Sequence, residues 1–195
     1  MGNRGCLHDD QRRLVRQVTS MKRWIICLRE YKNRKRVLMS PGQYTELFFL
    51  DEATALAAGH RPCAECRRQD FQRFKQAWIE GNSDAGLPLR SSVDLLDAHL
   101  DKDRRQKNQG QVTFRAQLSD LPNGAIVTVP DQQKLALWWE NRLREWSFAG
   151  YGPAISCDPG CEVVVHTPRS TVNALRAGYV PVVHESLLEM AEDAS

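Results

Sequence analysis

Two pairs of closely spaced cysteines are the residues of this chain whose types and spacing could do chemistry. Cys63-Ala-Glu-Cys66 is a Cys-x-x-Cys pair, and Cys157-Asp-Pro-Gly-Cys161 is a Cys-x-x-x-Cys pair. The turn within a Cys-x-x-Cys pair points both sulfurs the same way, so two thiolates can bind one metal ion. At the start of a helix, free backbone N–H groups and the helix dipole stabilise such thiolates. The Cys63/Cys66 pair therefore predicts a zinc site that needs two further ligands.

A redox dithiol is the alternative interpretation of Cys63 and Cys66. Thioredoxin-like Cys-x-x-Cys pairs follow a strand inside a βαβ unit. Here the pair follows a helical pattern, Gly59 and the segment His60-Arg-Pro, a context that favours a metal site over redox chemistry. In a reducing compartment, spaced cysteines indicate metal ligands or reactive thiols more often than disulfides.

The composition predicts a cytoplasmic protein with no membrane partner. The chain has 195 residues and a formal net charge of +3, which allows one domain or two small ones. Its longest apolar stretches resemble Leu47–Leu50, far shorter than the roughly 20 residues of a membrane helix. The segment Met1–Asp10 lacks the apolar core of a signal peptide.

The charge is divided unevenly along the chain. Residues 1–80 contain 16 Lys and Arg against 9 Asp and Glu, whereas residues 81–195 contain 11 against 15. The segment Glu80–Pro88 gathers Gly, Asn, Ser, Asp and Pro between two helical patterns, as linkers do. We therefore expect a zinc-binding module in residues 1–80 and an α+β domain of unknown function in residues 89–195.

In the first module the residue pattern predicts two strands and two helices. The strands are Arg23–Leu28 and Tyr44–Leu50; Asp51 then caps a helix that runs to Ala58, before Gly59. A second helix runs from Cys63 to Ile79, because its large apolar residues follow helical spacing. These residues are Phe71, Phe74 and Trp78.

In the second region the pattern predicts strands and two flanking helices, and the whole chain is expected to be α+β with a mainly antiparallel sheet. The predicted helices are Ser92–Leu100 and Pro168–Ala177. The predicted strands are Val112–Leu118, Ala125–Val129, Glu162–His166 and a hairpin of Leu135–Glu140 with Leu143–Phe148, which turns at Asn141 and carries Trp138, Trp139 and Trp146.

Residues 24–68, and most tightly Phe48 to Cys66, resemble the zinc-binding N-terminal module of the Ada DNA-repair regulators. That module has an aromatic strand, a helix ending in Glu-Ala-x-Ala-Ala-Gly-aromatic, and then Arg-Pro-Cys-x-x-Cys. His60 stands here in place of the aromatic residue. The matching residues are Phe48, Phe49, Glu52, Ala53, Ala58, Gly59, Arg61, Pro62, Cys63 and Cys66.

The resemblance implies a small Ada-like fold that closes a four-thiolate zinc site against DNA. In that module a Cys-x-x-x-Cys pair supplies the upstream ligands, and one of its cysteines accepts a methyl group from phosphotriesters. Only Cys27 lies at a comparable place here, and no cysteine stands four residues from it. The departure weakens the case for a dealkylating role.

The fourth zinc ligand is left open by the sequence. Cys6 and His8, in the segment Cys6-Leu-His8, are two candidates, and the Cys157/Cys161 pair is another. With four protein ligands the zinc would be structural, because a closed site has no open position for catalysis.

Basic side chains near this module suggest contact with nucleic acid, most simply DNA. Arg and Lys supply the salt-sensitive phosphate contacts that dominate nucleic-acid affinity. The candidates on or beside the module are Arg34, Lys35, Arg36, Arg61, Arg67 and Arg68.

The sequence therefore predicts a zinc-binding protein that contacts nucleic acid in a repair or regulatory role. One alternative is an enzyme that acts on nucleic acid or a modified base through the C-terminal region, where His99 lies among carboxylates. Another is a zinc-stabilised protein-interaction module. No catalytic residue is assigned, since no Gly-x-Ser-x-Gly, phosphate-binding loop or His-Glu-x-x-His motif occurs.

Overall fold

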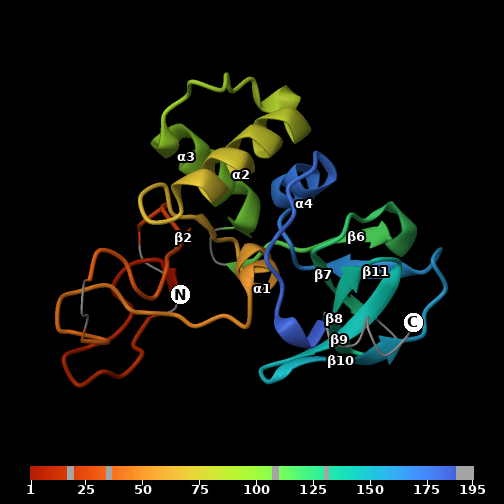
Figure 1. Cartoon of the computed structure of the whole chain (residues 1–195), viewed down its shortest axis with the longest axis horizontal. Coiled ribbons are helices and arrows are strands. Elements are labelled where there is room, and N and C mark those ends of the chain that lie inside the picture. Colours follow the sequence, from red (N-terminus) through yellow and green to blue (C-terminus); the bar gives the residue numbers. More distant parts are fainter. Residues whose placement is uncertain (17–19, 34–36, 107–109, 130–131, 188–195) are drawn as a thin grey trace.

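The computed structural model describes residues 1–16, 20–33, 37–106, 110–129 and 132–187. Within these residues the chain has a mixed α+β fold that contains a mainly antiparallel sheet and several helices (Figure 1). The predicted α+β class is confirmed at this level. None of the described helices has the length and apolar character needed to cross a membrane.

A small three-stranded sheet forms the N-terminal part of the fold. Its order is β1 (Gly2–Asn3), β2 (Ile25–Ile26) and β3 (Arg61–Pro62), with β1 antiparallel and β3 parallel to β2. The strand expected at Arg23–Leu28 is thus real but shorter. The strand expected at Tyr44–Leu50 is wrong, because only Leu47 of that segment forms an isolated bridge, to Gly2.

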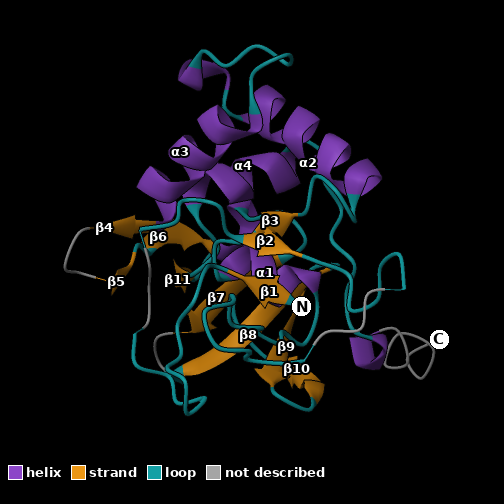
Figure 2. Cartoon of the chain, turned by 90° about the vertical axis from the view of Figure 1, so that its left-hand side faces the viewer, coloured by secondary structure: helices purple, strands orange, loops and turns teal. Residues whose placement is uncertain are grey.

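Four α-helices are described, and three of them pack as one layer (Figure 2). Asp51 caps α1 (Glu52–Ala57) by accepting a 2.8 Å hydrogen bond from the backbone N–H of Thr54, as the sequence predicts. Gly59 follows with φ of +81°, the left-handed conformation that glycine adopts freely. The helix expected from Cys63 begins five residues later. The layer consists of α2 (Arg68–Gly81), α3 (Val93–Arg104) and α4 (Arg169–Arg176).

A six-stranded antiparallel sheet forms the other part of the fold, in the order β10-β9-β8-β7-β11-β6. The predicted hairpin joins β8 to β9, and its turn residues Glu140 and Asn141 have φ of 48° and 58°, as a two-residue hairpin turn requires. The strand β10 was not predicted. The strands of this sheet are β6 (Phe114–Gln117), β7 (Ala125–Val129), β8 (Lys134–Trp139), β9 (Arg142–Ser147), β10 (Gly150–Ile155) and β11 (Glu162–Val165). Two further strands, β4 (Arg105–Gln106) and β5 (Gly110–Gln111), form a separate two-stranded sheet.

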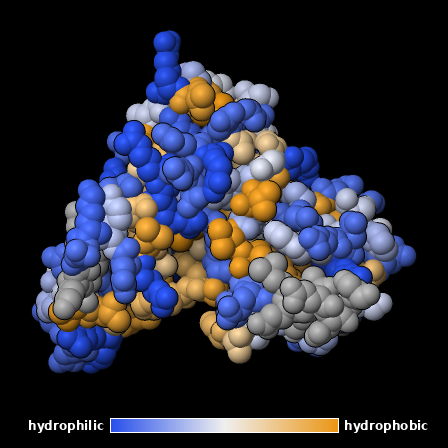
Figure 3. All heavy atoms as spheres, viewed as in Figure 1, coloured by the Kyte–Doolittle hydropathy of each residue, from blue (hydrophilic) through white to orange (hydrophobic). Residues whose placement is uncertain are grey.

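One buried apolar cluster joins the helices on both sides of residues 81–88. Phe74 and Trp78 of α2 are 0% and 1% exposed, and they pack in the same cluster as Leu96 of α3 and Leu175 of α4. Hydrophilic side chains cover much of the face in Figure 3, and apolar side chains gather near its middle. The division into residues 1–80 and 89–195 stays a prediction, and this cluster lies across it.

A buried ion pair fixes β3 against α3. Arg61 donates from Nε to Oδ1 of Asp97 at 2.9 Å and from Nη2 to Oδ2 at 2.7 Å. The side chains are 1% and 3% exposed, and the Arg61 guanidinium also donates to its neighbour's carbonyl oxygen and lies over the ring of Phe71. A bidentate pair of this kind holds both partners in one geometry.

We expect Asp97→Ala to lower the free energy of unfolding by about 3–5 kcal/mol, because Arg61 would keep a buried charge without its partner. Chemical denaturation measures this loss. The matched control on the same helix is Asp94→Ala, whose partner Arg23 and own side chain are 56% and 78% exposed, so its cost should be about 1 kcal/mol or less. Equal losses in the two variants would contradict the role given to the buried pair.

Candidate metal centre

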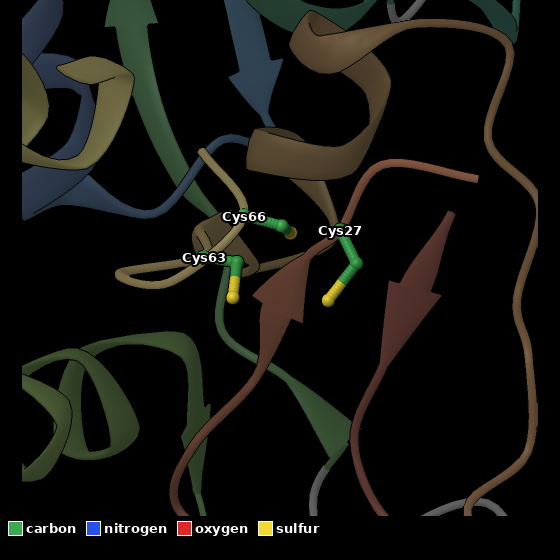
Figure 4. A group of neighbouring side chains, drawn as sticks. All are labelled: Cys27, Cys63 and Cys66. Atoms are coloured by element: carbon green, nitrogen blue, oxygen red, sulfur yellow. The ribbon is translucent and has the colours of Figure 1, made fainter. Parts of the chain in front are cut away.

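Three cysteine sulfurs from two distant segments lie together beside the small sheet. The Sγ atoms of Cys27, Cys63 and Cys66 are all within 4.8 Å of one another, and they form a triangle in Figure 4. Zinc–sulfur bonds of about 2.3 Å in a tetrahedral site put the sulfurs about 3.8 Å apart. Separations of at most 4.8 Å are therefore compatible with three ligands of one zinc ion.

The register of two parallel strands brings Cys27 next to Cys63. Ile25 lies opposite Arg61, and Ile26 lies opposite Pro62. The residue directly after each strand is a cysteine. The backbone N–H of Cys63 donates to the carbonyl oxygen of Ile26 at 3.0 Å, which continues the pairing by one residue. Paired residues of neighbouring strands point their side chains to the same face, so both thiols face the same space.

The third sulfur is supplied by the turn between β3 and α2. The carbonyl oxygen of Cys63 accepts from the backbone N–H of Arg67 at 3.1 Å, which closes a turn around Cys66. Backbone N–H groups also donate to the sulfurs: Leu28 to Cys66 at 3.4 Å and Glu65 to Cys63 at 3.5 Å. Such donors stabilise thiolates. Helix α2 starts after this turn, which explains its late beginning.

The thiols influence one another's ionisation. A hydrogen bond between the side chains of Cys27 and Cys63 lowers the pKa of Cys63 and raises the pKa of Cys27. Burial raises the pKa of Cys66. One thiolate in the triangle is thus favoured, and its neighbours tend to keep their protons. A metal ion would replace those protons, as metal binding to cysteines requires.

Arg67, next to the third cysteine, is anchored to the rest of the protein by carboxylates. The side chain of Arg67 is 10% exposed, and its guanidinium nitrogens lie 3.0 Å from Oε1 of Glu52 and 2.9 Å from Oδ2 of Asp70. Glu52 is itself 5% exposed. It also accepts from the hydroxyl of Tyr179 at 2.8 Å and from the backbone N–H of Val182 at 2.9 Å. The sequence did not predict this role of Glu52, because both of its partners after residue 170 are distant in the chain.

Cys6 and His8, offered as fourth ligands, do not join the three sulfurs. His8 is 3% exposed, and its Nδ1 lies 2.6 Å from the hydroxyl of Thr45 and its Nε2 lies 3.2 Å from the carbonyl oxygen of Ser40. The thiol of Cys6 donates to the carbonyl oxygen of His8 at 3.5 Å. Both residues hold the N-terminal segment together instead.

Cys157 and Cys161 are joined in a disulfide. This corrects the expectation that the spaced cysteines of the chain are free thiols or metal ligands. The four-residue separation and the Asp-Pro-Gly turn between them allow the two sulfurs to meet. The pair packs against the core of the six-stranded sheet, and in the bonded form it has no thiolate to offer.

The basic residues proposed for nucleic-acid contact lie in different environments. The guanidinium of Arg61 is buried in its pair with Asp97, and that of Arg67 is held by Glu52 and Asp70. Arg68 is exposed. Residues 34–36, which supply the other three candidates, lie outside the described residues.

His60 is another residue in this region whose surroundings the sequence did not predict. It is 2% exposed, and its ring lies 5.3 Å from Trp24 and 4.8 Å from Phe49, measured between centroids. Burial, followed by the charges of Arg4 and Arg104, lowers the pKa of His60 to about 3. A neutral ring therefore occupies the place that an aromatic residue has in the Ada pattern.

The other candidates for chemistry lie apart from the three thiols. His99 packs against Trp78, with ring centroids 5.7 Å apart. Trp138 is buried in the sheet core, where its Nε1 donates to the carbonyl oxygen of Leu121 at 2.9 Å.

Comparison with protein families, curated proteins and solved structures finds no match to this chain.

We expect Glu52→Ala to lower the free energy of unfolding by about 3 kcal/mol, because the hydroxyl of Tyr179, the backbone of Val182 and the charge of Arg67 would all lose a buried acceptor. Chemical denaturation of the metal-free protein measures this effect. Glu80→Ala is the control, since Glu80 is exposed and should change stability by about 0.5 kcal/mol or less. A Glu52 variant as stable as the Glu80 variant would refute the anchoring role.

Proposed function

We propose that this chain is a zinc-binding protein whose metal is held by Cys27, Cys63 and Cys66. The observation that carries the proposal is the meeting of three sulfurs within 4.8 Å from segments far apart in the sequence. An all-sulfur donor set suits zinc and other thiophilic metals and is a poor match for magnesium or calcium. The Cys-x-x-Cys turn is the commonest way for a chain to present two of those ligands.

The zinc would serve the fold by joining the ends of two strands to the start of a helix. Cys27 follows β2, Cys63 follows β3, and Cys66 stands two residues before α2. These are short elements: β2 and β3 have two residues each. Since two-residue strands supply few hydrogen bonds, a metal that ties them together adds directly to the free energy of folding.

We expect purified protein to hold one zinc ion, and Cys63→Ser or Cys27→Ser to lose it and to melt at a lower temperature. Metal analysis and thermal unfolding measure the two effects, with Cys6→Ser as the control that keeps zinc. The protein is prepared without oxygen and without added reductant, so that the clustered thiols stay reduced and the Cys157–Cys161 disulfide stays closed. No zinc in the wild type, or equal zinc in all variants, would contradict the proposal.

We also propose that this region contacts DNA in a repair or regulatory role, as its resemblance to the Ada module suggests. The exposed basic side chains nearest to the thiols in sequence support the proposal: Arg29 is two residues after Cys27, and Arg68 is two residues after Cys66. Exposed guanidinium groups are free to approach phosphates, whereas buried Arg61 is not.

We expect the combined variant Arg29→Glu/Arg68→Glu to weaken binding to a generic DNA duplex and to reduce the slope of log K against log salt by about 1 for each lost phosphate contact. Fluorescence anisotropy at several salt concentrations measures this. Arg142→Glu is the matched control, because Arg142 is exposed on β9, away from the thiols in the fold. If the wild type fails to bind duplex even at low salt, the zinc-stabilised interaction module becomes the better interpretation.

A further inference from the structure

The cysteines and histidines of this chain are all among the described residues, so the full set of possible soft ligands can be followed. Outside the three clustered cysteines, the thiol of Cys6 donates to the carbonyl oxygen of His8, and the ring of His8 bonds to the hydroxyl of Thr45. Cys157 and Cys161 are joined in a disulfide. The remaining imidazoles are engaged or enclosed elsewhere: His99 against Trp78, His166 with the hydroxyl of Thr128, His184 with the hydroxyl of Ser186, and His60 between Trp24 and Phe49.

His60 is close to Cys63 in sequence but does not complete the site. His60 and Cys63 flank the two residues of β3, one before it and one after it. Side chains alternate between the two faces of extended chain, so residues three apart point in opposite directions. The thiol of Cys63 faces Cys27, and the ring of His60 packs on Trp24. Among the described residues, no histidine, cysteine, aspartate or glutamate joins the three sulfurs within 4.8 Å.

Two exposed arginines that are close in sequence to the cysteines can offset the charge of an anionic fourth ligand. Zinc with three thiolates carries one net negative charge, and the exposed Arg29 and Arg68 stand near it along the chain. Cys66 is partly exposed, so the site has access to solvent on that side. A zinc ion with three protein ligands keeps its fourth position for a molecule from solution.

We propose that the zinc centre of this chain has an exchangeable fourth position that takes the thiolate of a small-molecule thiol. The inference rests on the proposed zinc site and deepens it. In the exchange, the incoming thiol gives its proton to the solvent, its sulfur bonds to the metal, and a solvent ligand leaves. No electron is transferred. A fourth sulfur gives the tetrahedral all-thiolate set that zinc favours in closed sites.

The test uses the full-length Cys157→Ser/Cys161→Ser variant, in which an added reductant or thiol has no disulfide to open and no new ligands to release. The protein is loaded with Co²⁺, whose visible absorption depends on the ligands around the metal. After preparation with a phosphine reductant, 2-mercaptoethanol is titrated in, with imidazole and chloride as parallel probes. We expect the sulfur-to-cobalt absorption to grow and to saturate at one thiol per metal, with smaller changes from imidazole and chloride. The half-saturating thiol concentration should rise about threefold or more in Arg29→Glu/Arg68→Glu and stay unchanged in Arg142→Glu.

Several results would overturn the inference. A cobalt spectrum that none of the probes changes means that the chain closes the site itself, and a spectrum altered by Cys6→Ser or His8→Ala would identify the ligand. A larger response to imidazole than to the thiol would refute the preference for a thiolate. Metal-dependent dimers in gel filtration would assign the fourth ligand to a second copy. Failure to bind any Co²⁺ or zinc would instead refute the proposed function itself, which separates the two failures.

Discussion

The buried ion pair between Arg61 and Asp97 is the constraint on which the thiol site depends. It fixes β3 on α3 through two hydrogen bonds of 2.9 and 2.7 Å between side chains that are almost completely buried. The pairing of β3 with β2 then sets Cys63 opposite Cys27. Because β2 and β3 are only two residues long, their own hydrogen bonds could not hold this register alone. Burial of the two charges makes the arrangement specific, since a buried Arg61 or Asp97 without its partner would be an unpaired charge out of contact with water, which is strongly destabilising.

A second set of contacts connects the thiol site with the C-terminal part of the chain. Two adjacent acidic residues at the start of α1 accept hydrogen bonds from different parts of the fold. Asp51 accepts from the hydroxyl of Tyr151 at 2.7 Å, on β10 of the large sheet. Glu52 accepts from the hydroxyl of Tyr179 and holds Arg67, the residue after Cys66. Burial and the neighbouring carboxylates raise the pKa of both tyrosines, so each stays a hydrogen-bond donor. These contacts tie the segment that carries Cys66 to the start of α1, and the start of α1 to the large sheet.

The sequence predicts well where local chemistry decides the structure, and poorly where distant partners decide it. The helix after Asp51 and the hairpin at Asn141 follow from capping and turn residues, and both are confirmed. The role of Arg61 could not be found this way, because its partner Asp97 lies 36 residues away and a charge pattern does not distinguish a surface arginine from a buried one. The parallel pairing that brings Cys27 to Cys63 is likewise non-local. Only the resemblance to the Ada module pointed to Cys27.

The electrostatics of the three sulfurs explain why a metal suits this place. Three thiolates this close would repel one another strongly, so the metal-free site must keep protons, with the thiol of Cys27 bonded to Cys63. Cys66 also resists ionisation, because burial raises its pKa. A divalent cation removes the repulsion and uses all three sulfurs, and its binding must then release protons to solvent. Acid therefore competes with the metal, and affinity falls as the pH is lowered. The fold supplies the positions of the sulfurs through Arg61 and Glu52, and the cation supplies the charge that stabilises them.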